Sequence, residues 1–300
     1  MYHDVHVLTN HAAGSAQAVA WPDGWTEWEI GPDLSPEQAT NRALEAGADL
    51  VVACGGDGTV GSVACALVGT GVPLLIVPMG TANVFASDLG LPSDPLAVVA
   101  LATGETPAVV RDVDVGRVDL EDAGRDLFVL RLGLGTEASM VTEADSDLKD
   151  KVGRLAYFVA FVRLTRSQSR VTYTITVDGR EETAHGVTCL VCNSVNPGLR
   201  GVDLLPKASV ADGALTVVVF RWMSVWTLFR LMATAAWSFA TGHGFHIDRS
   251  VLVRHYGGER VEVVSDPPQV AACDGDALES GGTLRAHVEP GALRVLVPAQ

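Results

Sequence analysis

The sequence lacks several features that would define its class at once. No stretch of about 18 apolar residues is free of charge, and the nearest candidate, Ala214 to Phe245, carries Arg221 and Arg230. Met1 to Asp4 shows no charged-then-apolar signal peptide, so we expect neither secretion nor a transmembrane segment. Basic residues are few: 21 Lys and Arg against 36 Asp and Glu give a net charge of −15, which argues against a general nucleic-acid binder.

Cysteine is rare and odd in number. The five cysteines lie at positions 54, 65, 189, 192 and 273, and this scatter predicts reduced thiols in a cytoplasmic protein. Cys189 and Cys192 have a metal-like spacing, but they lie in an apolar, β-branched run from Val187 to Val195. Residues three apart on a strand point to opposite faces, so we expect two core thiols and no zinc site.

What the sequence does contain is an alternation of strands and helices up to about Gly104. Hydrophobic residues make up 48% of the 300 positions and charged residues 19%, which excludes disorder and allows one large or two ordinary domains. Buried strands are predicted at Val5–Leu8, Asp49–Cys54 and Pro73–Pro78, and helices at Pro36–Ala46 (N-cap Ser35), Val60–Val68 and Pro95–Thr103. This alternation indicates a parallel, Rossmann-like sheet covered on both faces.

Beyond about residue 108 the pattern changes to strands. They are predicted at Val109–Leu120, Phe128–Gly133, Val171–Asp178, Val187–Cys192, Leu215–Phe220, Arg260–Ser265 and Leu293–Val297. Asp178-Gly179 between β-forming residues indicates a hairpin, and helices are expected at Leu148–Ser167 and Ser224–Thr241. We therefore predict an α/β domain over residues 1–108 and a mostly antiparallel β-sandwich over residues 109–300, with a cleft between them.

Three glycines in four positions follow the predicted strand that ends at Cys54. The run Gly55-Gly56-Asp57-Gly58-Thr59 lies between a buried strand and a helix, where glycine lets the backbone approach a ligand and helix N–H groups favour an anion. We predict a phosphate cradle, with a plain tight turn as the alternative. No Gly-Lys-Ser/Thr follows, and the next strand lacks the acid that a dinucleotide oxidoreductase needs.

A second small-residue turn follows the next strand, in the run from Pro78 to Ala86. Because the carboxyl ends of parallel strands meet at one edge of a sheet, the two turns should face each other there. Asp57 would repel a bare phosphate. We expect this residue either to act through a magnesium ion or a water molecule, or to cap a helix.

These two turns, Gly55–Thr59 and Pro78–Asn83, resemble the diacylglycerol kinase catalytic-domain family, which includes soluble bacterial lipid kinases and has sphingosine and ceramide kinases as relatives. The likeness runs along nearly the whole chain. Further segments that resemble the family's motifs, in the same order, are Asn10–Gly14, Leu132–Ala138, Lys151–Tyr157, Leu205–Gly213 and Cys273–Asp276.

The resemblance implies an ATP-dependent kinase of diacylglycerol or a related lipid. The first domain would bind the nucleotide and the second the lipid. Carried over to this chain, the nucleotide-binding positions are Asn10, Gly55, Gly56, Asp57, Gly58, Thr59, Gly61, Gly80, Thr81 and Asn83.

The resemblance also assigns a general base. The family's Asp-Gly-Glu matches Asp274-Gly275-Asp276, so Asp276 takes the role of base with Asp274 as its neighbour. A carboxylate that is ionised at neutral pH can accept the proton of an alcohol as it attacks the γ-phosphorus. Aspartate is one methylene shorter than glutamate, so the base must lie closer to its substrate. An ordinary Asp-Gly hairpin tip is the alternative interpretation.

A structural magnesium ion is a further implication of the resemblance. Its ligands here would be the Asp212 carboxylate with the carbonyls of Ser209 and Ala214, a donor set that suits a hard cation. A turn at Asp212-Gly213 without an ion is the alternative. Ala211 replaces the first acid of the family's Asp-Asp-Gly, and Val84 follows Asn83 where the lipid kinases often have Asp.

Two acid-free segments could bring such a protein to its lipid. Gly213 to Ile247 holds three of the six tryptophans, and Lys151 to Thr176 carries five basic residues. Together they could form a local cationic, aromatic face that contacts a membrane surface peripherally. Burial of the first segment in the core and solvation of the second are the alternatives, and a homodimer is left open.

Two rival functions stay open at this point. A soluble-substrate kinase such as NAD kinase shares the Gly-Gly-Asp-Gly turn, but it should show an Asn-Glu pair, and neither Asn193 nor Asn196 is followed by Glu. The second rival is a non-catalytic lipid-binding protein that keeps the kinase fold.

Overall fold

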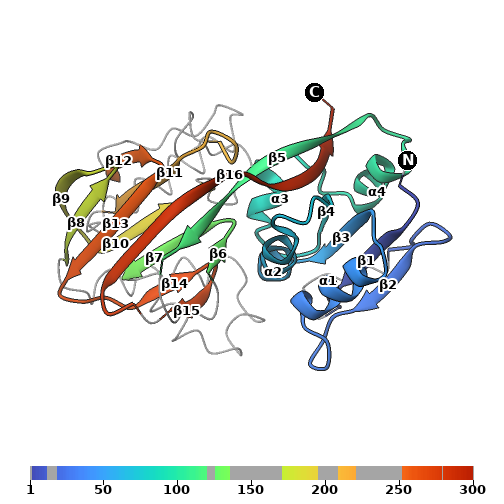
Figure 1. The fold of residues 1–300 in the computed structure, drawn as a ribbon, viewed down its shortest axis with the longest axis horizontal. Helices are drawn as coiled ribbons and strands as arrows, with labels where there is room; N and C mark the ends of the chain where they lie inside the picture. The colour runs from blue at the N-terminus through green and yellow to red at the C-terminus, as the bar shows by residue number, and fades with distance from the viewer. Residues whose placement is uncertain are drawn as a thin grey trace, which may run out of the picture.

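The computed structural model describes residues 2–11, 19–119, 126–135, 171–194, 209–220, 252–278 and 280–299 (Figure 1). The helices predicted at 148–167 and 224–241, and most of the two acid-free segments, lie outside these residues. In the described part of the chain, no helix is both long and apolar enough to cross a membrane.

The first half of the chain forms a parallel sheet, as predicted. Its strands lie in the order β2 (Thr26–Glu29), β1 (Val5–Thr9), β3 (Leu50–Gly55) and β4 (Leu74–Pro78), and each neighbouring pair is parallel. Every residue of β1 and β3 is buried, which explains their continuous apolar runs. The edge strand β2 was not predicted, because three of its four residues are exposed and it has no apolar run.

The described helices around this sheet are α1 (Pro36–Glu45), α2 (Asp57–Leu67), α3 (Val84–Asp88) and α4 (Pro95–Thr103). Helix α1 begins with the predicted cap: the Ser35 hydroxyl accepts from Gln38 N, and the Gln38 side chain accepts from Ser35 N. Helix α2 begins three residues earlier than the predicted Val60, because Gly56 alone joins it to β3. Asp57 to Thr59 therefore belong to the first helical turn and not to a loop.

The second half is a sandwich of two sheets. One is antiparallel and six-stranded, in the order β12 (Leu252–Gly258), β11 (Leu215–Phe220), β10 (Thr188–Cys192), β7 (Arg131–Gly135), β14 (Ala271–Cys273) and β15 (Asp276–Leu278). The other contains β13 (Arg260–Asp266), β8 (Val171–Val177) and β9 (Arg180–Gly186). Leu132, Tyr173 and Val263 are fully buried in the core between them. The predicted hairpin at Asp178-Gly179 joins β8 to β9.

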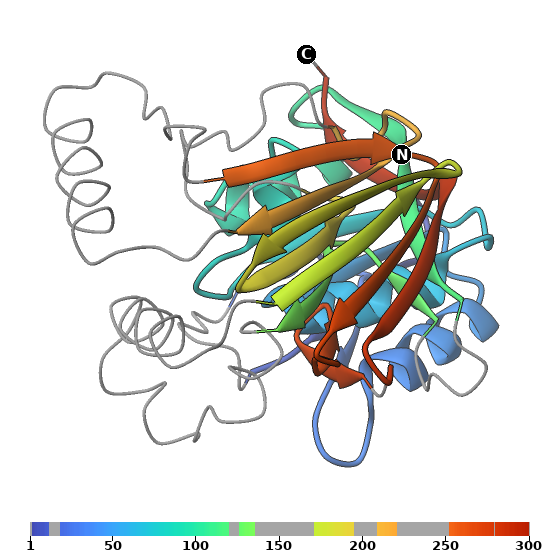
Figure 2. The same cartoon turned by 90° about the vertical axis from the view of Figure 1, so that its left-hand side faces the viewer.

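A long antiparallel ribbon connects the two halves (Figure 1). It consists of β5 (Ala108–Val118) and β16 (Thr283–Pro298). Val295 at the end of β16 pairs in parallel with Leu74 of β4, so one sheet continues from the first half into the second. Seen from the side in Figure 2, the strands of the second half stand in front of the helices of the first.

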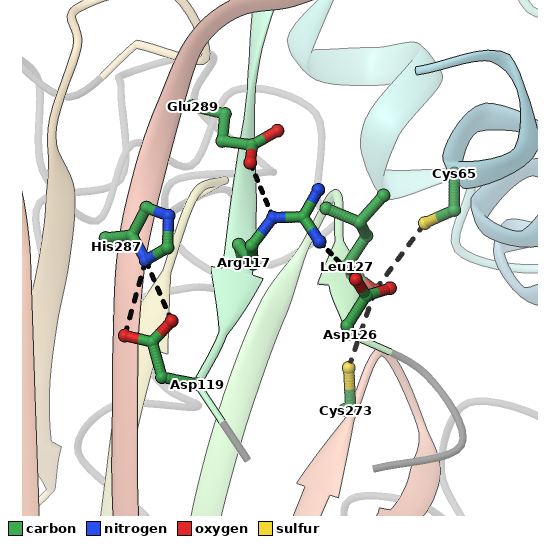
Figure 3. Close-up of polar contacts among 8 residues, drawn as sticks. All are labelled: Cys65, Arg117, Asp119, Asp126, Leu127, Cys273, His287 and Glu289. Atoms are coloured by element: carbon green, nitrogen blue, oxygen red, sulfur yellow. Dashed lines mark hydrogen bonds and ion pairs between the residues drawn. The ribbon is translucent and has the colours of Figure 1, made fainter. Parts of the chain in front are cut away.

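The ribbon contributes to both hydrophobic cores. Val113 and Leu293 pack in the first core, whereas Val118 and Leu284 pack in the second. Ion pairs of Arg117 with Glu289 and Asp126, and of His287 with Asp119, lie along the ribbon (Figure 3). Since the final strand of the chain is part of the first core, that core forms only when the two ends of the chain meet.

Candidate active site

The two glycine turns touch each other at the carboxyl ends of β3 and β4, as the strand order predicted. Gly55 pairs with Pro78, and Met79 N donates to Gly55 O at 2.9 Å. A Cβ atom placed on Gly80 would lie 2.6 Å from the Gly56 Cα, closer than any real contact. The backbones of the two turns can approach this closely because position 80 is glycine; a Cβ atom on Gly56 would lie 3.4 Å from the Gly80 Cα, an ordinary contact.

Asn10 joins the first turn from the end of β1. Its N–H donates to Cys54 O at 2.9 Å, and its Nδ2 donates to Thr59 Oγ1 at 2.9 Å. Thr59 is buried beneath Gly55, where a Cβ atom would lie 2.8 Å from the Thr59 Cβ. Asn10, Gly55 and Thr59 are therefore brought together as predicted, although Thr59 packs inward.

The start of α2 offers unpaired donors. Its N-cap, Gly56, has no side-chain oxygen, so no side-chain cap binds the first amides of the helix. Gly58 in the first turn is exposed, with nothing within 4 Å of its would-be Cβ. The first backbone amides of α2 and the positive end of its helix dipole together favour the binding of an anion here. Gly61, one turn further along, is buried within the helix and lies away from this open end.

Asn83 closes the second turn. It has a left-handed backbone with φ of 49°. Its Oδ1 accepts from Gly80 N at 2.8 Å and its Nδ2 donates to Gly80 O at 2.7 Å. Thr81 is exposed at the tip of the same turn. The Asn83 side chain thus shapes the turn, and it makes no cap for α3, the helix that follows.

Asp57 supplies that missing cap. Its carboxylate accepts from Phe85 N at 3.4 Å, and the amides of Asn83, Val84 and Phe85 all lower its pKa. Burial outweighs them, so the pKa of Asp57 lies above its ordinary value. Helix capping was one of the expected roles of Asp57. The helix that it caps is α3, which follows the neighbouring strand β4, and not α2, to which Asp57 itself belongs.

Asp274 holds a turn of the second half in place. With Gly275 it forms a two-residue tip between β14 and β15, with φ of 47° and 96° and Cys273 paired with Asp276. Its carboxylate accepts three successive amides, from Val129 N at 2.8 Å, Leu130 N at 2.9 Å and Arg131 N at 2.8 Å. The hairpin alternative is thus the observed backbone, and it leaves Asp276 exposed at the start of β15.

The turn that Asp274 holds lies next to the first half of the molecule. Cys65 of α2 and Cys273 of β14 both point their thiols at the Leu127 carbonyl, at 3.5 and 3.8 Å (Figure 3). Further along this turn, the charge of Arg131 lowers the pKa of Asp57. The hairpin with Asp276 therefore approaches α2 through residues 127–131. The sequence analysis did not single out Arg131, because this residue lies just before the Leu132–Ala138 segment that resembles a motif of the family. Its only signal in the sequence is that it is a lone basic residue within an apolar strand.

The expected magnesium ligands lie in one turn, where backbone amides bind the carboxylate. The Asp212 carboxylate accepts from Ser209 N at 2.9 Å and from Ala214 N at 3.1 Å. Among the described residues, no group of three His, Cys, Asp or Glu side chains gathers to hold a metal. Asp212 closes its own turn, which is the alternative interpretation.

Asp114 is a buried carboxylate that the sequence motifs did not point to. It is 4% exposed and accepts from Gly213 N at 2.7 Å and Gly291 N at 2.9 Å. It thereby ties the turn that contains Asp212 to the ribbon.

All five cysteines are free thiols, and Cys189 and Cys192 are both buried, as predicted.

Comparison with known proteins supports this architecture. Residues 5–118 match the model of the diacylglycerol kinase catalytic domain, and residues 131–297 match the YegS C-terminal NAD kinase beta sandwich-like domain. A crystal structure described as a diacylglycerol kinase from Bacillus anthracis superposes with a TM-score of 0.67, at 21% identity over 99% of this chain and 98% of that one.

Relatives in sequence agree with these matches. The "Probable lipid kinase YegS-like" of Pseudomonas aeruginosa PAO1 is 34% identical over 95% of this chain and 85% of its own. A diacylglycerol kinase of Mycobacterium tuberculosis H37Rv is 27% identical over 64% of this chain and 61% of its own. The chain spans 58% of the length of a Synechocystis relative that is 30% identical.

Fold, site and relatives together define a kinase of the lipid-kinase type. The chain belongs to the diacylglycerol kinase family, in its YegS-like branch.

Proposed function

We propose that the protein transfers the γ-phosphoryl group of ATP to a hydroxyl of diacylglycerol or a related lipid. The observation that carries this proposal is the contact between the two glycine turns beside the uncapped start of α2. Glycine backbones and free helix amides are a suitable surface for a triphosphate. We place the phosphates along Gly56 and Gly58 and at Thr81, with Asn10 and Asn83 holding the shape of the two turns.

In this proposal Asp276 is the general base. Of the two acids in the hairpin, Asp274 has three amide hydrogen bonds to its carboxylate, whereas Asp276 is exposed one residue beyond the tip. Asp276 accepts the hydroxyl proton while the lipid oxygen bonds to the γ-phosphorus. The bond from that phosphorus to the bridging oxygen breaks, and ADP leaves. Asp274 acts as a positioning residue.

Magnesium enters the proposal only with the nucleotide. Mg²⁺ is commonly bound through substrate phosphates, and in the 209–214 turn two backbone amides already bind the Asp212 carboxylate. When bound to the phosphates, the ion would offset their charge.

A lipid acceptor is supported by the names of the relatives, which include diacylglycerol kinase and lipid kinase. A lipid acceptor requires peripheral contact with a membrane surface. We assign this contact to the acid-free segments, which are cationic and aromatic in a chain of net charge −15.

Radiolabel transfer tests this function. The protein is incubated with ATP labelled at the γ-phosphate and with vesicles that contain diacylglycerol, other lipid alcohols or no acceptor, and in parallel with NAD. We expect label in the lipid fraction. Label in NADP would favour the soluble-substrate kinase, and ATP or lipid binding without any transfer would favour the non-catalytic rival.

A further inference from the structure

Arg131 is hydrogen-bonded to Asp274, two residues before the proposed base, although Arg131 and Asp274 are far apart in sequence. It is the first residue of β7. Its N–H donates to Asp274 Oδ1 at 2.8 Å, and its carbonyl accepts from Asp274 N at 3.0 Å. The backbone of Arg131 is therefore fixed to the same hairpin tip that presents Asp276.

The side chain of Arg131 points away from the sandwich core. Side chains alternate between the two faces of a strand, and Leu132 and Leu134 are fully buried in that core. Arg131 pairs with Cys192 of β10, and residues directly opposite each other share a face; Cys192 is not part of the core cluster. Arg131 is half-buried, and its side chain therefore projects from the outer face of the six-stranded sheet.

The positive charge of Arg131 acts on the glycine turns. Leu130, the residue before Arg131, accepts from Ser194 N at 3.0 Å. The Ser194 hydroxyl donates to the Asp88 carboxylate of α3, so this end of the sheet contacts the helix that Asp57 caps. The charge of Arg131 also lowers the pKa of Asp57. Asp57 is already committed to the amides of α3. A triphosphate on the neighbouring turns would bring more negative charge to the same place, within a chain of net charge −15. A nearby cation would offset that charge.

We propose that Arg131 is a further catalytic residue, whose guanidinium group binds the γ-phosphoryl oxygens between the glycine turns and Asp276. This inference rests on the proposed function and names a residue for the same site. The planar guanidinium group can donate two parallel hydrogen bonds to two phosphoryl oxygens.

Arg131 keeps its proton throughout the transfer. As the bond to the leaving ADP oxygen breaks and the bond to the lipid oxygen forms, negative charge spreads over the other oxygens of the phosphoryl group. The guanidinium group stabilises this charge most in the transition state. Asp274, which holds the Arg131 backbone, then positions the base and the cation together.

Nucleotide binding separates this role from a purely structural one. We compare Arg131→Ala and Arg131→Lys with the control Arg285→Ala. The control removes an exposed arginine of β16 that forms an ion pair with Glu262 of β13. Titration with ADP and with a β,γ-imido ATP analogue is followed by calorimetry. We expect Arg131→Ala to lose about 10- to 100-fold in affinity for the analogue, with little change for ADP. Arg131→Lys should recover part of that affinity, and Arg285→Ala should match the wild type.

The rate gives a second measurement. Arg131→Ala should lower kcat by about 1,000-fold or more, as for other arginines that contact a transferring phosphoryl group. Added guanidinium ion at low millimolar concentration should restore part of the rate, while urea should not. If Arg131→Ala fails to fold, the same titrations are made on Arg131→Lys and Arg131→Gln.

The outcomes distinguish this inference from the proposed function. If all variants bind ADP and the analogue like the wild type, Arg131 has no phosphate contact, whether or not lipid is labelled. Equal losses for both ligands, in step with a lower Tm, would also overturn the inference. A selective loss for the analogue in a protein that labels no lipid would support Arg131 and reject the lipid acceptor.

Discussion

The molecule contains two Asp-Gly hairpins whose backbones are nearly the same. Asp178 and Gly179 have φ of 47° and 80°, and Asp274 and Gly275 have 47° and 96°. In both, the Asp carboxylate accepts backbone amides of a distant segment: Glu259 and Arg260 at the first tip, residues 129–131 at the second.

The difference between the hairpins lies in what each one holds. The first tip binds a strand inside the sandwich, whereas the second binds the turn that approaches α2 and the glycine turns. The residue after the tip is Arg180 in the first hairpin and Asp276 in the second. The same local structure is therefore an ordinary anchor at one site and the proposed carrier of a catalytic base at the other.

The largest effect is expected one residue beyond the second tip. Asp276→Asn removes the proton acceptor and should lower label transfer by about 100- to 10,000-fold with an unchanged Tm. Arg180→Ala, at the equivalent position of the first hairpin, should change neither the rate of label transfer nor the Tm. A wild-type rate for Asp276→Asn would remove this residue from the mechanism and leave both hairpins as anchors.

The two tips themselves should differ less. Asp274→Ala leaves three amides unpaired and should cost about 2 to 4 kcal/mol of unfolding free energy, with a loss of activity because the turn that includes Arg131 is released. Asp178→Ala frees two exposed amides and should cost about 1 kcal/mol, with full activity. Urea unfolding and the transfer assay measure both. Equal activity losses would contradict the separation of roles.

Asp57 extends the comparison to a third carboxylate that binds amides of a neighbouring segment. Burial raises its pKa, so at acid pH the folded protein keeps a proton that the unfolded chain has lost. Its contribution to stability therefore falls as pH rises from about 3.9, the unfolded value, through the raised folded value.

Asp57→Asn should remove that slope. The unfolding free energy of the variant, relative to the wild type, should increase as the pH rises above about 4 and then stay level once Asp57 is ionised in the folded wild type. Denaturant unfolding at several pH values measures this small effect. A relative stability that falls with pH over this range would mean that the amides of α3, and not burial, dominate the pKa of Asp57.

Much of the fold could be predicted from local patterns. Ser35 as N-cap of α1 and Pro95 at the start of α4 depend on contacts within a few residues, and both helices begin where they were predicted. The exposed edge strand β2 and the three-residue strands β14 and β15 were missed, because none of them has an apolar run long enough to indicate a strand.

The candidate site divides in the same way. Strand order and glycine positions predicted that the two turns would meet. No local pattern indicated that Asp57 caps α3 or that Arg131 lies beside Asp274, whereas the amides that bind Asp212 come from its own turn. A carboxylate has the same sequence signature whether it binds a metal, a proton or an amide, and the partners of Asp57 and Asp274 come from remote parts of the chain.

By itself the sequence determined the alternation of strands and helices, the place of the glycine turns and the two hairpin tips, since each depends on neighbours a few residues apart. The tertiary structure decided which amides Asp57, Asp114 and Asp274 bind and which arginine lies beside the second hairpin. Those pairings join residues separated by up to 177 positions, such as Asp114 and Gly291, and they exist only once the ribbon has brought the ends of the chain together.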